Sequence, residues 1–210
     1  PVLANGSTLA YSENQAATAI NTAITVADVD NATLATATVQ ITGNYQSAED
    51  VLAFTNAAGM GNIAGVWNSG TGTLALSSAG ATATLAEWQA ALRAVTYANP
   101  SSDPSTAART VGFTINDGAS ASNIVTSAIN VSATNNAPAL SGLAGDALTY
   151  AEGDGSVVIE QGGNATVADL DSANFDTGTL TVSFTSGSDS AEDVLAVRDE
   201  GTGGGQIGVS

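Results

Sequence analysis

The chain has 210 residues, of which 20 are acidic and three basic, and its formal net charge is -17 at pH 7. This charge excludes a nucleic-acid partner and an anionic membrane surface, because almost no cation is present to neutralise phosphates, and no apolar run approaches the roughly 18 residues of a membrane span. Cysteine and histidine are absent, which excludes disulfides, thiol catalysis, and the usual zinc ligand and general base.

Short runs of Val, Ile and Thr, separated by Gly, Asn, Asp and Ser, predict many short strands joined by tight turns. The run at 110–116 alternates best, with Val111, Phe113 and Ile115 expected on one face. The spacing of the runs is typical of a β-sandwich. In chain order, we expect strands near residues 9–11, 24–26, 37–42, 51–55, 65–68, 73–77, 94–97, 110–116 and 124–132.

One segment, residues 85–93, has a helical period instead of an alternating one. Leu85 and Trp88 begin an apolar face, and Thr84 with Glu87 three residues later forms a capping-box pattern. The pattern predicts one short helix that closes an end of the sandwich, with Trp88 packed in the core as its plug.

Three motifs recur in the same order about 140 residues later. They are Tyr-x-Glu, Val-Ala-Asp-x-Asp and Ser-Ala-Glu-Asp-Val-Leu-Ala, and the last is identical at all seven positions between residues 47–53 and 190–196. We infer a tandem repeat, with a complete β-sandwich over residues 1–136 and the first half of a second repeat over residues 137–210.

The ends of the chain carry two further expectations. Because the sequence opens at Pro1 without a Met, we expect it to be a piece or a processed product of a longer protein. Half a sandwich leaves a sheet edge and a core open. We therefore expect the second repeat to be completed by further chain or by a strand from a neighbouring subunit.

The repeated acids suggest a calcium site in place of disulfides. In an extended segment, two acids two residues apart project to the same side, and calcium takes about six to eight oxygen ligands, so several acids must contribute. A solvated loop, or for Asp117 a plain Asp-Gly turn, is the alternative. The candidate metal ligands are Glu13, Asp28, Asp30, Glu49, Asp50, Asp117, Asn136, Glu152, Asp169, Asp171 and Asp193.

The order of these motifs, with Asn-Asn-Ala-Pro between the repeats, resembles cadherin-like repeats. Residues 92–97, 108–118 and 171–180 look most like the cadherin-like repeats of giant, type I-secreted, RTX-adhesin-like bacterial surface proteins. The resemblance implies tandem Greek-key β-sandwiches, calcium at repeat junctions, and a role in adhesion or biofilm. The linker lacks the Asn-Asp-Asn core of cadherins, and the predicted helix stands where animal repeats carry an acidic motif.

The resemblance to cadherin-like repeats also implies a place for each ligand. Asp28 and Asp30 would face whatever precedes the first repeat, whereas Asp169 and Asp171 would face the lower end of the first repeat. The shared site would be completed there by Glu13, one or both of Glu49 and Asp50, Asp117 and Asn136.

We therefore expect a non-enzymatic, extracellular spacer at the cell surface, stiffened by calcium, whose partners are neighbouring repeats or copies of itself. The alternative is a homophilic or carbohydrate-binding module that recognises cell-surface glycans, with Trp67 or Tyr45 as the sugar platform. Glycoside hydrolysis by a carboxylate pair would need a cleft with aromatic platforms, and aromatic residues make up only 5% of the chain.

Overall fold

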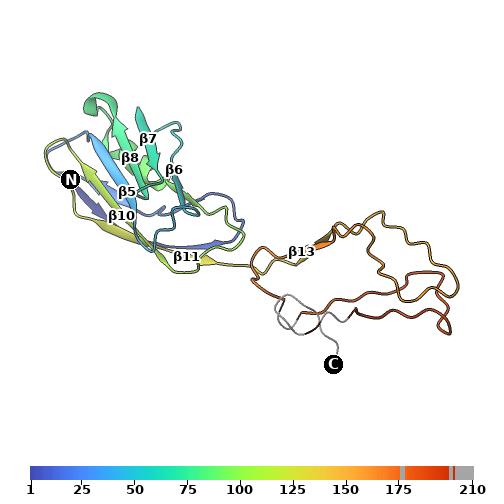
Figure 1. The fold of residues 1–210 in the computed structure, drawn as a ribbon. Helices are drawn as coiled ribbons and strands as arrows, with labels where there is room; N and C mark the ends of the chain where they lie inside the picture. The colour runs from blue at the N-terminus through green and yellow to red at the C-terminus, as the bar shows by residue number, and fades with distance from the viewer. Residues whose placement is uncertain (176–177, 199–200, 202–210) are drawn as a thin grey trace. The chain divides into compact units, whose positions relative to one another are not determined.

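A computed structural model describes residues 1–175, 178–198 and 201 (Figure 1). The chain divides into two compact units, Pro1–Asp171 and Ser172–Ser210, and the first contains the whole first repeat, the linker and the start of the second repeat. Within the described ranges, no helix combines the length and the apolar character needed to cross a bilayer.

The larger sheet of the first repeat runs antiparallel except at one edge, where β2 and β11 pair in parallel. Its interior strands largely alternate buried and more exposed residues. In spatial order its six strands are β2 (Thr8–Ser12), β11 (Val125–Ser132), β10 (Arg109–Asn116), β5 (Thr36–Gly43), β8 (Thr73–Ser78) and β7 (Ile63–Asn68).

The second layer is smaller, with β9 at its centre. A separate two-stranded ribbon joins the start of the chain to the segment before Asp28. The three strands of the small sheet are β3 (Thr18–Ala19), β9 (Thr96–Ala98) and β6 (Val51–Ala53), and the ribbon consists of β1 (Val2–Ala4) and β4 (Thr25–Ala27).

The first repeat buries one apolar core, and the all-β sandwich expected from the sequence is confirmed. Val111, Phe113 and Ile115 of β10 are all buried, as their alternation predicts. Every strand predicted in this repeat overlaps an observed one. The short strands β1 and β3 were not predicted, because two or three residues are too few to show an alternating pattern.

Helix α1 (Leu85–Arg93) has the predicted bounds and the predicted capping box. The hydroxyl of Thr84 accepts from the N–H of Glu87, and the Glu87 carboxylate accepts from the N–H of Thr84 at 2.7 Å. Trp88 is fully buried and donates its ring N–H to the carbonyl of Leu34 at 3.0 Å. A 3₁₀ turn, η1 (Ala79–Ala81), precedes the helix.

Local structure of the first repeat recurs in the second. Strand β12 (Ala139–Ser141) pairs with β13 (Thr166–Ala168) in the register of β1 with β4, so that Leu140 lies opposite Val167 as Leu3 lies opposite Val26. Leu3 is buried, however, and Leu140 is exposed. The ribbon thus forms from local sequence, whereas among the described residues only the first repeat buries it under a core. The expected boundary at residue 136 stays a prediction.

Candidate functional site

The lower end of the first repeat is organised by Glu13, which follows β2. Its N–H donates to the carbonyl of Ser132, the last residue of β11, at 2.9 Å. Its Oε2 accepts from the N–H of Thr134 at 2.8 Å. Although acidic, the residue is buried, because these bonds hold it against the strand that leads into the linker.

Asn136 connects the linker to this end of the sandwich. Its Nδ2 donates to Oε1 of Glu13 and to the carbonyl of Ser102, both at 3.0 Å, and lies 3.5 Å from the carbonyl of Thr134. Three oxygen atoms from three segments therefore converge on one amide nitrogen. Asn136 was among the predicted ligands, whereas the carbonyl of Ser102 was not, since backbone oxygens leave no signal in a sequence.

Asp171, from the second repeat, contacts the same linker. Its Oδ2 accepts from the backbone N–H of Asn136 at 2.7 Å, and its own N–H donates to Oδ1 of Asp169 at 3.4 Å. The Asn136 N–H, followed by the Asp169 carboxyl group, holds the pKa of Asp171 below its usual value. The other oxygen, Oδ1 of Asp171, is buried and has no hydrogen-bond partner.

The upper end of the first repeat carries Asp28 and Asp30, the pair that corresponds to Asp169 and Asp171. Oδ1 of Asp28 accepts from the N–H groups of Asp30 and Asn31, both at 3.1 Å, and Oδ2 lies 3.0 Å from the amino group of Pro1. The Asp30 carboxyl group and the Pro1 amino group lower the pKa of Asp28, while the Asp28 carboxylate raises that of Asp30. Two close carboxylates resist ionising together.

Asp117 belongs to this upper end and not to the lower one. Its Oδ2 accepts from Nδ2 of Asn31 at 3.1 Å, and its Oδ1 accepts from the N–H groups of Ala119 and Ser120 at 2.7 Å. These backbone bonds lower the pKa of Asp117. Asp117 and Glu13 lie at opposite ends of the sheet, so Asp117 does not join the site at which it was expected.

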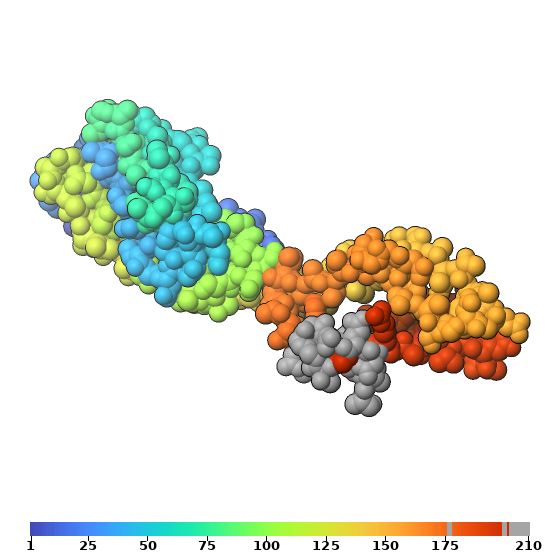
Figure 2. Space-filling model, viewed as in Figure 1, coloured from blue at the N-terminus to red at the C-terminus, as the bar shows by residue number. Residues whose placement is uncertain are grey.

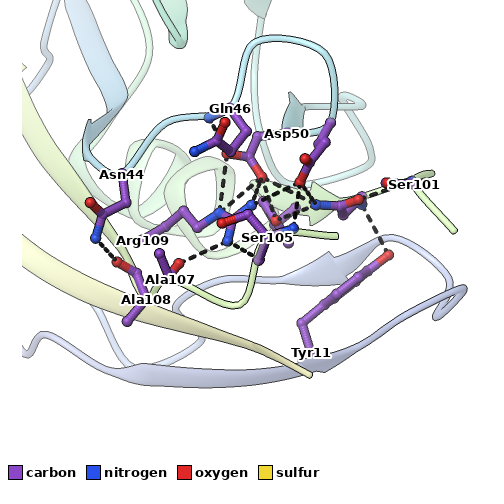
Figure 3. A network of polar contacts seen from close by, with 12 residues as sticks. Tyr11, Asn44, Gln46, Asp50, Ser101, Ser105, Ala107, Ala108 and Arg109 are labelled. Atoms are coloured by element: carbon purple, nitrogen blue, oxygen red, sulfur yellow. Dashed lines mark hydrogen bonds and ion pairs between the residues drawn. The ribbon is translucent and has the colours of Figure 1, made fainter. Parts of the chain in front are cut away.

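The carboxylates of Glu49 and Asp50 both form ion pairs with Arg109, and Figure 3 shows Asp50 beside the guanidinium. Arg109 and Asp50 are both buried, and Nε of Arg109 donates to Oδ1 and Oδ2 of Asp50 at 3.1 and 3.2 Å. Its Nη2 donates to Oε2 of Glu49 at 3.2 Å, and its Nη1 donates to the carbonyls of Ser105 and Ala107. These carboxylates thus neutralise a buried guanidinium in the interior of the repeat.

Arg109 is the site residue that sequence reasoning missed. Its signal was present, since it stands two residues before Val111 and in phase with the buried face of β10. The chain has only three basic residues. One that lies on a buried strand face needs a carboxylate partner there, because an unpaired buried charge is costly. The identical acidic motifs by themselves predict metal ligands instead.

The remaining predicted residues lie on the surface. Glu152 and Asp193 are both exposed. Across the described part of the chain, no group of three or more Asp, Glu, His or Cys side chains is close enough to hold a metal ion. Any metal at either end of the first repeat would therefore take part of its ligands from carbonyl, amide and water oxygens.

The two aromatic residues named as a sugar platform pack against each other. Tyr45 and Trp67 meet edge to face with ring centroids 6.2 Å apart, and both are partly buried against the core. The face of the first repeat shown in Figure 2 is closed, with no deep cleft. Recognition of a carbohydrate stays a prediction.

Comparisons of the chain with protein-family models, with curated proteins and with solved structures gave no significant match.

Proposed function

We propose that this chain is a calcium-stiffened, non-enzymatic spacer from an extracellular bacterial adhesin or matrix protein. The observation that carries the proposal is the linker site, where three oxygens converge on the amide of Asn136 while Oδ1 of Asp171 is buried without a partner. A buried, unpaired carboxylate oxygen is costly, and a cation is the partner that this oxygen-rich surrounding favours.

The path of the chain through the first repeat supports an end-to-end array. The side chain of Asn123, just before β11, bonds to both backbone groups of Leu3 at the upper end, and Ser132 at the end of β11 bonds to Glu13 at the lower end. A strand of this length spans about 25 Å. The chain therefore enters the repeat at one end and leaves at the other, as a spacer requires.

The proposed ligands at the linker are all oxygen donors, which suit a hard cation. At most two of the carboxylates of Glu13, Asp169 and Asp171 would ligate one ion, and Asn136 and Ser102 would supply an amide and a carbonyl oxygen. The carboxylates of the two repeats repel each other in a chain of net charge -17. Calcium bound between them supplies positive charge that offsets this repulsion. Glu49 and Asp50 are not part of this set, because Arg109 occupies them.

The upper end of the first repeat offers the receiving half of an equivalent site. Asp28, Asp30 and Asp117 lie there, and the Asp-x-Asp turn at 28–30 repeats at 169–171 with the same N–H to Oδ1 bond. A preceding repeat with its own equivalent of Glu13 would complete that site. In this proposal the same junction is built at each step of the array.

The test is a calcium titration of the full chain. We expect chemical-shift changes at the amides of Glu13, Asn136 and Asp171, a dissociation constant of about 10⁻⁴–10⁻³ M, and a higher melting temperature with calcium than with chelator. At a hundredfold excess over the dissociation constant, binding stabilises the fold by about 2.7 kcal/mol. Asp171→Asn should abolish these effects, whereas Asp146→Asn, at an exposed carboxylate, should leave them intact.

Two outcomes would overturn the proposal. If chelator changes neither the melting temperature nor the small-angle scattering profile of the wild-type chain, these acids are solvated and the junction is not a calcium site. If the chain binds members of a glycan array with or without calcium, it is a recognition module and not a spacer.

A further inference from the structure

The turn that carries Asp50 recurs in the second repeat with the same hydrogen bonds. In the first repeat the N–H of Gln46 donates to Oδ2 of Asp50, and the N–H of Asp50 donates to the carbonyl of Gln46, both at 2.8 Å. In the second repeat the same two bonds join Asp189 and Asp193, both at 2.7 Å. The carboxylate is therefore held in the same local geometry in both repeats.

The first repeat shows what this carboxylate binds. Arg109 lies in phase with three apolar residues of β10, so that guanidinium and apolar side chains share one buried face. Strand β10 lies antiparallel against β5, pairing Val111 with Ile41 and Phe113 with Val39. The arginine and the apolar residues of one strand thus bind the Asp50 turn and β5 together.

The second repeat contains the counterpart of β5, and no described residue of that repeat forms a strand against it. When the identical acidic motifs are aligned, Leu180, Val182 and Phe184 correspond to the three buried residues of β5. Their exposed fractions are 68%, 63% and 48%. Residues 178–185 are described, and none of them belongs to a strand. An apolar row of this kind next to a preformed carboxylate turn is an incomplete binding surface.

The negative charge beside this apolar row indicates what kind of partner binds it. Asp189 replaces Gln46, so that the second turn carries three acids, Asp189, Glu192 and Asp193, where the first carries two. Glu192 and Asp193 are both exposed. A lipid surface or a second copy of this acidic chain would cover the apolar row and leave these charges unpaired or opposed.

We propose that residues 179–196 bind a β-strand of the pattern Arg-x-apolar-x-apolar-x-apolar, with the arginine on the Asp193 turn and the apolar residues against Leu180, Val182 and Phe184. The strand adds antiparallel, by backbone pairing, and its alternate side chains give the specificity. The guanidinium sets the register in which the added strand pairs, because its bidentate contact with the carboxylate is lost if the strand shifts by one residue. The proposal does not depend on calcium.

The experiment adds a labelled peptide with the sequence of residues 107–118, AARTVGFTINDG, to the full chain. We expect saturable binding by fluorescence anisotropy, and hydrogen-exchange protection confined to amides within 179–196. A matched peptide with Arg109→Gln should bind roughly tenfold more weakly or worse, as should the original peptide to the Asp193→Asn chain. The Asp154→Asn chain, altered outside the surface, should bind as the wild type does.

Three results would overturn the proposal. Equal binding of the arginine and glutamine peptides would mean an unspecific apolar surface. Protection at the edge strand β7 would place the peptide on the first repeat. Self-association of the chain that excludes the peptide would make residues 179–196 an interface between copies. Because Asp193 is exposed, its substitution tests binding without unfolding the protein.

Discussion

Tyr97 of β9 donates its hydroxyl proton to Oδ1 of Asp50 at 2.6 Å, in the interior of the first repeat. The same carboxylate binds Arg109, and the ring of Tyr97 packs edge to face on Tyr11 with centroids 4.9 Å apart. The two tyrosines thus extend the Arg109 network into the core. Because a half-satisfied buried network is costly, each member depends on the others.

Arg109→Met should lower the free energy of unfolding by about 3–5 kcal/mol, because it leaves the carboxylate of Asp50 buried without a cation. Urea denaturation of the full chain measures this change. Asp103→Ala, at an exposed carboxylate in the loop before β10, is the control and should stay within about 0.5 kcal/mol of the wild type.

Arg109→Lys should fall between these two variants, since lysine keeps the charge but not the planar fork of donors. A loss below about 1 kcal/mol for Arg109→Met would show that the ion pair is dispensable, as some buried pairs are.

Because Tyr97 is buried, we expect the free energy of unfolding to fall at alkaline pH. Burial, and next its hydrogen bond to Asp50, raise the pKa of Tyr97. In the unfolded chain a tyrosine ionises near pH 10, so its stabilising contribution is complete below about pH 10 and is lost as the pH rises above that value.

Tyr97→Phe should therefore flatten the fall in unfolding free energy between about pH 10 and 11.5. Glu87→Gln is a matched control, because it changes no group that titrates in this range. Parallel curves for wild type and Tyr97→Phe would contradict the prediction.

Trp88→Phe should destabilise the first repeat by about 2 kcal/mol, because it removes the bond to the Leu34 carbonyl and leaves a small cavity. Thermal or urea unfolding measures the change. Trp67→Phe should cost less, since Trp67 is only partly buried. Equal costs for the two variants would mean that Trp88 does not fix α1 in the core.

Because Glu87 caps the first turn of α1, we expect the stability of this turn to fall at acidic pH. Its bonds to the backbone and side chain of Thr84 lower its pKa, so its contribution is present above the unfolded value, near pH 4.3, and is lost as the pH falls through the folded one. NMR titration of the carboxyl carbon should place its pKa below that value. Thr84→Ala should move it back upward, and an unchanged pKa would rule out the capping box in solution.

The sequence by itself determined the local structure of this protein. The helix at 85–93 with its capping box, the alternation of β10 and the internal repeat all follow from residues close together in the chain. The ribbon and the acidic turn of the second repeat show the same principle, because both form there although their described residues are mostly exposed. Short-range hydrogen bonds need only neighbouring residues.

Only the tertiary structure decided which acids meet which partners. Glu49 and Asp50 have the same local sequence as Glu192 and Asp193. In the first repeat, however, they form ion pairs with the buried Arg109, which is distant in sequence. Asp117 lies far from Glu13 because β10, which precedes Asp117, runs opposite to β2, which precedes Glu13, so the two strands finish at opposite ends of the sheet. Burial of a charge depends on long-range packing, and a turn motif identical in both repeats therefore has two different environments.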